Sequence, residues 1–156
     1  MKKQAWIVIV NDFKSKEADF KSGFKPSQAI WSPSKGKDGR DAYRLMREVK
    51  KDDVIITLSD KKLFSSVSLS KNLYKEKNIN FSEWAGDIYH INIHNTINLS
   101  PPLVKQDIFR SSNKLLLEKI SDVSTVFYTK NFGLRQGAYI TPCSKELLTF
   151  LNNEFM

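Results

Sequence analysis

The stretch DVIITLSDKKLFSSVSL, residues 53–69, decides the fold because it predicts two β-strands joined by a short turn. Residues 53–58 form an apolar run rich in β-branched side chains, and apolar and polar side chains alternate over residues 63–69. The polar residues 59–62 between the two runs are typical of a turn. We therefore predict an antiparallel hairpin, with one strand buried on both faces and its partner on one.

Further strands are predicted on both sides of this hairpin from β-branched runs or from alternation of apolar and polar residues. They are residues 6–10, 28–31, 89–94 and 123–128. The first of them is continuously apolar, which predicts a central strand. The polar segment 70–80 predicts a long loop, and Pro101-Pro102 predicts a break in the chain.

Three helices are predicted from apolar residues that recur at helical spacing. Residues 42–49 carry the clearest pattern, and residues 113–120 form a second, shorter amphipathic segment. Thr141 is expected to cap a last helix with Pro142 at its first position. About six strands and about three helices in this order predict an α+β fold, a curved sheet or small β-barrel, in a single domain over residues 1–156.

The composition is that of a basic globular chain. The net charge is +8, and hydrophobic residues make up 40% of the sequence. A basic surface favours polyanions such as nucleic acid. No apolar run approaches the roughly 20 residues of a membrane helix, so we expect no membrane partner and a cytoplasmic location. The Asn- and Lys-rich composition suits a prokaryote. The single cysteine excludes an internal disulfide and a cysteine-based zinc site.

Candidate catalytic groups are few. Asp53, Asp60 and Lys62 resemble the carboxylate and lysine arrangement of metal-dependent nucleases, but their spacing is wrong, and we expect surface turn residues. His90 and His94 are too far apart on a strand for easy joint metal binding, so we expect loosely packed or solvent-facing side chains. Cys143 would lie in the first turn of the last helix, where the pKa of a thiol can fall. No motif demands a cofactor or a metal, and a binding module is favoured over an enzyme.

Two tryptophans stand out because small or polar residues flank them. They are Trp31, in the segment AIWSP, and Trp84, in SEWAG, whereas Trp6 lies in an apolar strand and is expected in the core. Two indole faces brought together can hold a base that has been flipped out of a helix. The alternative is that both rings plug the open ends of a barrel, and the residues themselves leave this open.

Several segments resemble the YTH and EVE branch of the PUA-like superfamily. They are residues 30–32 with the basic, glycine-containing loop after them, the start of the helix at 41–43, strand 54–58, the hairpin arm 63–67, the stretch WAGDIY at 84–89, and LRQGAYITP at 134–142. The resemblance extends from Trp6 to Leu151. It implies a PUA-like fold that holds one modified base in an aromatic cage.

By position, the resemblance makes Trp31 and Trp84 the cage walls and lets Ser32 offer backbone groups to the base edge. It places Ser59 and Asp60 near the pocket floor. The third aromatic residue stays open among Phe64, Tyr43 and Tyr89. The basic residues expected at the nucleic-acid backbone are Lys35, Lys37, Arg40 and Arg135.

The function expected from this resemblance is reading a 6-methyladenine or 5-methylcytosine type of base in DNA. Such domains resemble the N-terminal targeting modules of McrBC-type restriction systems, which implies a motor of the AAA+ class and a nuclease in other domains or subunits. Three alternatives stay open: an RNA-binding PUA-like domain, a small metal-dependent nuclease or hydrolase using Asp53, Asp60 or Cys143, and a protein-interaction domain.

Overall fold

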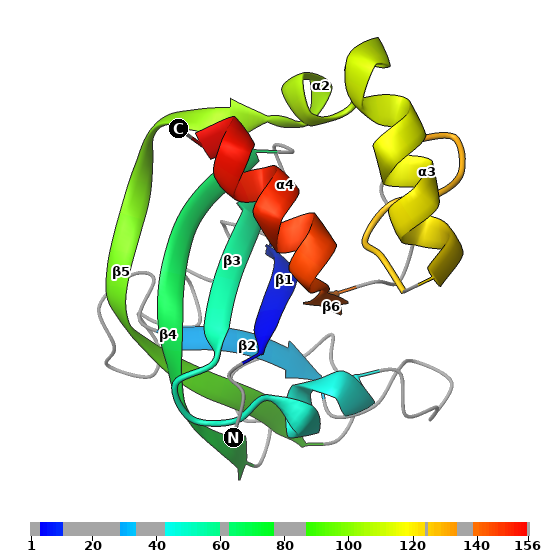
Figure 1. Cartoon of the computed structure of the whole chain (residues 1–156). Coiled ribbons are helices and arrows are strands. Elements are labelled where there is room, and N and C mark those ends of the chain that lie inside the picture. Colours follow the sequence, from blue (N-terminus) through cyan, green and yellow to red (C-terminus); the bar gives the residue numbers. More distant parts are fainter. Residues whose placement is uncertain are drawn as a thin grey trace.

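The computed structural model describes residues 4–10, 29–33, 43–59, 63–76, 87–123, 125–133 and 139–155. These residues form one six-stranded sheet with the strand order β2-β5-β4-β3-β1-β6. The strands are β1 (Ala5–Val10), β2 (Ala29–Pro33), β3 (Val54–Ser59), β4 (Leu63–Glu76), β5 (Ile88–Val104) and β6 (Ile140–Cys143). The helices are the 3₁₀ turns η1 (Arg44–Glu48) and η2 (Ser111–Asn113), and α2 (Lys105–Ile108), α3 (Lys114–Val123) and α4 (Lys145–Phe155). The predicted α+β class is confirmed (Figure 1).

The predicted hairpin is confirmed at the centre of this sheet. β3 and β4 are antiparallel, with Val54 opposite Leu69 and Ile56 opposite Val67. β1 lies parallel to β3 on one side and antiparallel to β6 on the other. The first predicted strand is therefore a central one, as its continuous apolar run indicated.

The two longest strands overturn two predictions. β4 continues to Glu76, where a loop was expected, and β5 runs for 17 residues through Pro101 and Pro102. The ladder between β4 and β5 shifts between Phe64 and Ser66, which pair with Leu103 and Asn98. The prolines thus lie in the irregular part of the ladder, where a missing N–H costs no regular hydrogen bond.

The predicted helices are confirmed in part. Residues 114–123 form α3, whereas the pattern around residues 42–49 gives only the short 3₁₀ turn η1. The expected start of the last helix is wrong, because Thr141 and Pro142 belong to β6. α4 begins at Lys145, and the Ser144 hydroxyl caps it by accepting a 3.2 Å hydrogen bond from the Leu147 N–H. Residues 125–128 form no strand, and Val126, Phe127 and Tyr128 pack into the core instead.

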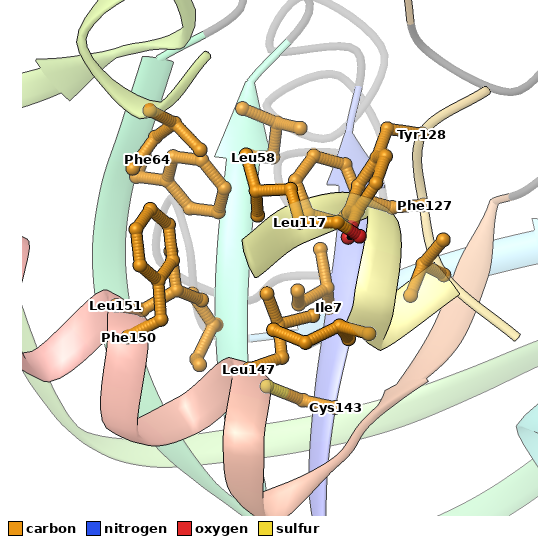
Figure 2. Packing of buried hydrophobic residues seen from close by; sticks show 14 of the residues in the cluster. Ile7, Leu58, Phe64, Leu117, Phe127, Tyr128, Cys143, Leu147, Phe150 and Leu151 are labelled. Carbon is orange, nitrogen blue, oxygen red and sulfur yellow. Dashed lines mark hydrogen bonds between the residues drawn. The ribbon is translucent and has the colours of Figure 1, made fainter. Parts of the chain in front are cut away.

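Alternation along the strands sends side chains to two hydrophobic cores. In β1, Ala5 and Ile7 face one core, whereas Trp6 and Val8 face the other. The first core lies under α2, α3 and α4, and Figure 2 shows Leu147, Phe150 and Leu151 of α4 pointing at the sheet. The second core joins β1, β2, β3 and β5 to η1. In the described part of the chain, no helix is long and apolar enough to cross a membrane.

Candidate functional site

Trp31 lies within β2, and its ring is almost fully buried, with 4% of the residue exposed. Its neighbour across the ladder is His90 of β5, and the two ring centroids are 4.7 Å apart. Tyr74 of β4 contacts the same imidazole at a centroid distance of 4.9 Å and pairs with His90 in the ladder. Trp31, His90 and Tyr74 form a row of three rings across three strands, which we call the aromatic row.

Ser32 is buried and lies on the opposite face of β2 from the Trp31 ring, because successive strand residues point to opposite faces. It pairs across the ladder with Tyr89, which belongs to the second core. The Tyr89 hydroxyl accepts a 3.1 Å hydrogen bond from Nη1 of Arg47 in η1. This hydrogen bond holds the Arg47 guanidinium at the Tyr89 side chain, on the same face of the sheet as Ser32.

Two further tyrosines complete this face. Tyr43 and Tyr139 pack edge to face with centroids 5.8 Å apart, and both belong to the rim of the second core. The backbone of Trp31 donates a hydrogen bond to the Tyr139 hydroxyl. Burial raises the pKa of Tyr43, and it raises that of Tyr139 despite this hydrogen bond, so both phenols stay protonated at physiological pH.

The structure thus brings Ser32, Tyr43 and Tyr89 to one face of β2 and places the Trp31 ring on the other. Phe64 is not brought to them: it is fully buried in the first core, edge to face with Phe127 at 5.6 Å. Ser59 ends β3 opposite Val10. The other predicted site residues lie outside the described residues: Trp84, Asp60, Lys35, Lys37, Arg40 and Arg135.

Asp53, a candidate for metal chemistry, has a structural role. It is buried rather than a surface turn residue, which corrects the expectation. Its carboxylate accepts hydrogen bonds from the N–H of Gln4, the indole Nε1 of Trp6 and the N–H of Lys50. Across the described ranges, no three His, Cys, Asp or Glu side chains come close enough to hold a metal ion.

Cys143 lies in β6 rather than in a helix, which corrects its predicted position. The residue is buried against the first core, and burial raises the pKa of its thiol to about 12. A thiol that stays protonated is a poor nucleophile, so its surroundings do not activate it.

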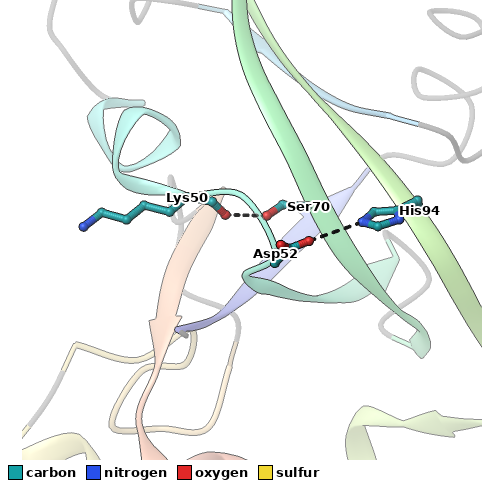
Figure 3. Close-up of polar contacts among 4 residues, drawn as sticks. All are labelled: Lys50, Asp52, Ser70 and His94. Carbon is teal, nitrogen blue, oxygen red and sulfur yellow. Dashed lines mark hydrogen bonds and ion pairs between the residues drawn. The ribbon is translucent and has the colours of Figure 1, made fainter. Parts of the chain in front are cut away.

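The two histidines differ from each other. His90 is buried within the aromatic row, which corrects the expectation of a loose or solvent-facing ring. His94 is partly exposed, and its Nε2 lies 3.7 Å from Oδ1 of Asp52 in the turn before β3. Figure 3 shows this pair beside the hydrogen bond that the Ser70 hydroxyl donates to the Lys50 carbonyl, at 2.6 Å.

Sequence reasoning missed three residues of this region. Tyr74 fell in a predicted loop, Arg47 on the outer face of a predicted helix, and Tyr139 in a segment noted only for its resemblance. The available signal for a continued strand was the adjacent pair Leu73 and Tyr74, but the polar residues around it masked it.

The sequence matches no protein-family model, and a search of curated proteins finds no match either. Solved structures do match over nearly the whole chain. The N-terminal domain of Staphylothermus marinus McrB matches with a TM-score of 0.53 and 10% identity, covering 98% of each chain. The DUF55 domain of human thymocyte nuclear protein 1 gives 0.50 and 12%, covering 97% of this chain and 98% of that one.

An ASCH protein from Zymomonas mobilis is also similar, with a TM-score of 0.56 and 8% identity, covering 97% of this chain and 96% of that one. At such identities the likeness concerns the fold and not the activity. The α+β arrangement of this chain, with its six-stranded mixed sheet, matches these structures over nearly their whole length, and the chain therefore has a PUA-like fold.

Proposed function

We propose that this chain is a nucleic-acid-binding domain that reads a modified base in DNA, with the indole of Trp31 as one wall of the base pocket. The observation that carries the proposal is the way Trp31 is held. Its ring contacts the imidazole of His90, which lies in β5. Its backbone is hydrogen-bonded to Tyr139, which directly precedes β6. A wall fixed in this way loses little freedom on binding, which favours affinity.

The other parts follow the resemblance to EVE and YTH domains. Trp84 is proposed as the opposite wall, and Ser32 as the residue next to the base edge. Tyr43 and Tyr89 lie on the Ser32 face of β2, opposite the Trp31 ring, and Phe64 is enclosed in the first core, so none of the three predicted candidates for the third aromatic residue shares a face with Trp31. Lys35, Lys37, Arg40 and Arg135 are proposed phosphate contacts.

The energies of base stacking and phosphate binding are consistent with separate roles for the pocket and the basic residues. Extruding a base costs a few kcal/mol, and stacking on an aromatic side chain recovers about 1–3 kcal/mol per base. Phosphate contacts supply affinity that does not depend on sequence and falls as salt rises, and the net charge of +8 provides for them. The pocket then supplies selectivity, and the basic surface supplies most of the binding.

One of the similar structures is the N-terminal domain of an McrB protein. We propose by analogy that this chain directs a modification-dependent restriction system, in which an AAA+ motor and a nuclease lie in other domains or subunits. Fold-level analogy is the warrant for this part of the proposal.

The test is binding of one fluorescent duplex in four versions: unmodified, 5-methylcytosine, 5-hydroxymethylcytosine and 6-methyladenine. Wild-type protein is expected to prefer one version at physiological salt. Trp31→Ala is expected to abolish that preference and leave weak, salt-sensitive binding, whereas Leu115→Ala, at an exposed position on α3, should change neither. If a folded Trp31→Ala protein loses equal affinity for modified and plain DNA, the proposed pocket is ruled out. If wild type binds a matched RNA more strongly than the DNA, the ligand is RNA.

A further inference from the structure

Tyr74 is the exposed end of the aromatic row. The residue is 43% exposed, whereas Trp31 and His90, the other two members, are buried. One side of the phenol ring is therefore supported by the imidazole, and much of the rest is open to solvent. Single exposed aromatic residues are common on protein surfaces, but this one is backed by two buried rings from neighbouring strands.

The strand that carries Tyr74 is open at this point. β3 pairs with β4 only as far as Leu69, and two backbone hydrogen bonds continue the contact to Ser70. Beyond Ser70, β5 is the one described strand that pairs with β4. Among the described strands, the part of β4 that carries Tyr74 thus has β5 on one side and no strand on the other, and a bound chain can approach it there.

Two lysines lie near Tyr74 in the sequence. Lys71 and Lys75 are both exposed, and with Glu76 directly after them they leave this segment with a net positive charge. Lys75 pairs with Tyr89 and so leaves the strand on the opposite face from Tyr74, while Lys71 lies in the irregular part of the ladder. Their charge favours phosphates near this end of the sheet.

From this arrangement we infer that Tyr74, Lys71 and Lys75 form a second nucleic-acid contact, at which an unpaired base stacks on the phenol ring. The inference rests on the proposed function only in that the chain binds nucleic acid. A base inside a duplex has both faces covered by its neighbours, so an exposed ring can accept only a base that is already unstacked. Through His90, Tyr74 is two ring contacts from Trp31, and so it suits the strand opened around an extruded base.

The experiment measures anisotropy of a fluorescein-labelled, unmodified dT dodecamer and of a blunt mixed-sequence duplex of the same length, with the full chain. Tyr74→Ala is expected to weaken binding of the single strand about tenfold and binding of the duplex less than twofold, because only the single strand offers a free base. Tyr74→Phe keeps the ring and should bind as wild type does. Ile97→Ala removes another exposed apolar side chain of the same sheet, 67% exposed on β5, and should change neither affinity.

The outcomes separate this contact from the pocket. A Tyr74→Ala effect below twofold, an equal loss on both probes, or an equal loss in Tyr74→Phe each overturns the stacking contact, as does failure of wild type to bind the dodecamer. A loss confined to the double variant Lys71→Ala/Lys75→Ala would also overturn it, leaving a phosphate contact. Preference for a modified duplex is expected to survive Tyr74→Ala, so a failed pocket and a failed stacking contact give different results.

Discussion

The indole Nε1 of Trp6 donates a 3.0 Å hydrogen bond to Oδ2 of Asp53, which ties β1 to the turn that precedes β3. The same carboxylate accepts the backbone N–H of Gln4 at 3.1 Å and that of Lys50 at 2.9 Å. Both side chains of the pair are buried. One buried carboxylate thus organises three donors at the end of the sheet where β1 and β3 begin.

Asp53→Asn is expected to lower the free energy of unfolding by about 2–3 kcal/mol. The Asn side chain keeps one acceptor oxygen but has an NH₂ group in place of the other, and this donor faces a buried N–H group. The substitution also removes the charge that strengthens the hydrogen bonds to Asp53. Urea unfolding followed by circular dichroism measures the change. Asp52→Asn, at the adjacent and more exposed carboxylate, serves as the control and should cost less than about 1 kcal/mol. An equal cost at both positions would contradict the role given to Asp53.

Tyr139→Phe is expected to destabilise the protein by about 1–2 kcal/mol, since it leaves the backbone N–H of Trp31 without its hydroxyl partner. The loss should be local to β2. Hydrogen exchange of the Trp31 amide is therefore predicted to accelerate more than that of Ile56 in β3. Tyr43→Phe is the matched control because Tyr43 packs on the same ring, and exchange at Trp31 should stay unchanged in it.

The Cys143 thiol is expected to be inert toward a thiol reagent at pH 8 in the folded protein and to react at least about 100-fold faster in denaturing urea. Burial raises its pKa to about 12, so the folded state holds the proton over a range in which the unfolded thiol, with a pKa near 9, releases it. Stability contributed by this group is present below pH 9 and is lost as the pH rises toward 12.

The urea midpoint of wild type should accordingly fall more between pH 8 and pH 10.5 than that of Cys143→Ala. Tyr128, whose pKa burial raises to about 12, adds a similar loss in both proteins and cancels in the comparison. Fast labelling of the folded protein would show that the strand opens readily around Cys143.

Asp52 has a φ of 70°, in the left-handed region that glycine adopts without cost. Asp52→Gly and Asp52→Ala both remove the contact with His94, so the difference between them isolates the backbone conformation. We expect Asp52→Ala to be less stable than Asp52→Gly by about 1 kcal/mol. The measurement is urea unfolding of both variants, with His94→Ala to show the small contribution of the contact between His94 and Asp52, below about 1 kcal/mol. Equal stability of the two variants would mean that the turn relaxes.

The hairpin of β3 and β4 was predictable because its signal is local: a β-branched run, four polar residues and an alternating run. The extension of β4 to Glu76 was not predictable, since Lys71 and Asn72 are polar and exposed, and β5 is the one described strand that pairs with this part of β4. The last helix was misplaced because Pro142 suits the first position of a helix as well as the edge strand it occupies. In each case long-range pairing overrode a local preference.

The sequence could single out residues for the candidate site but not their geometry. Trp31 was chosen from its flanking residues and Ser32 from the resemblance to EVE and YTH domains. Adjacent strand residues face opposite sides, and only the register shows that Tyr89 lies with Ser32 and His90 with Trp31. Phe64 looked equivalent to Tyr43 and Tyr89 in the sequence, although it faces the other core. No local pattern indicates that Tyr139 reaches the backbone of Trp31 across 108 positions, from residue 31 to residue 139.

The position of β6 beside β1 has a consequence for how the chain folds during synthesis. β1 leaves the ribosome early, yet its neighbour β6 begins at Ile140, so one edge of this apolar strand stays open until nearly all of the described chain is made. Closing so long a loop is slow, and an uncovered strand edge can pair with other chains in the meantime. Until β6 has left the ribosome this edge of β1 thus stays uncovered, and the sheet can close only once the chain through α4 has emerged.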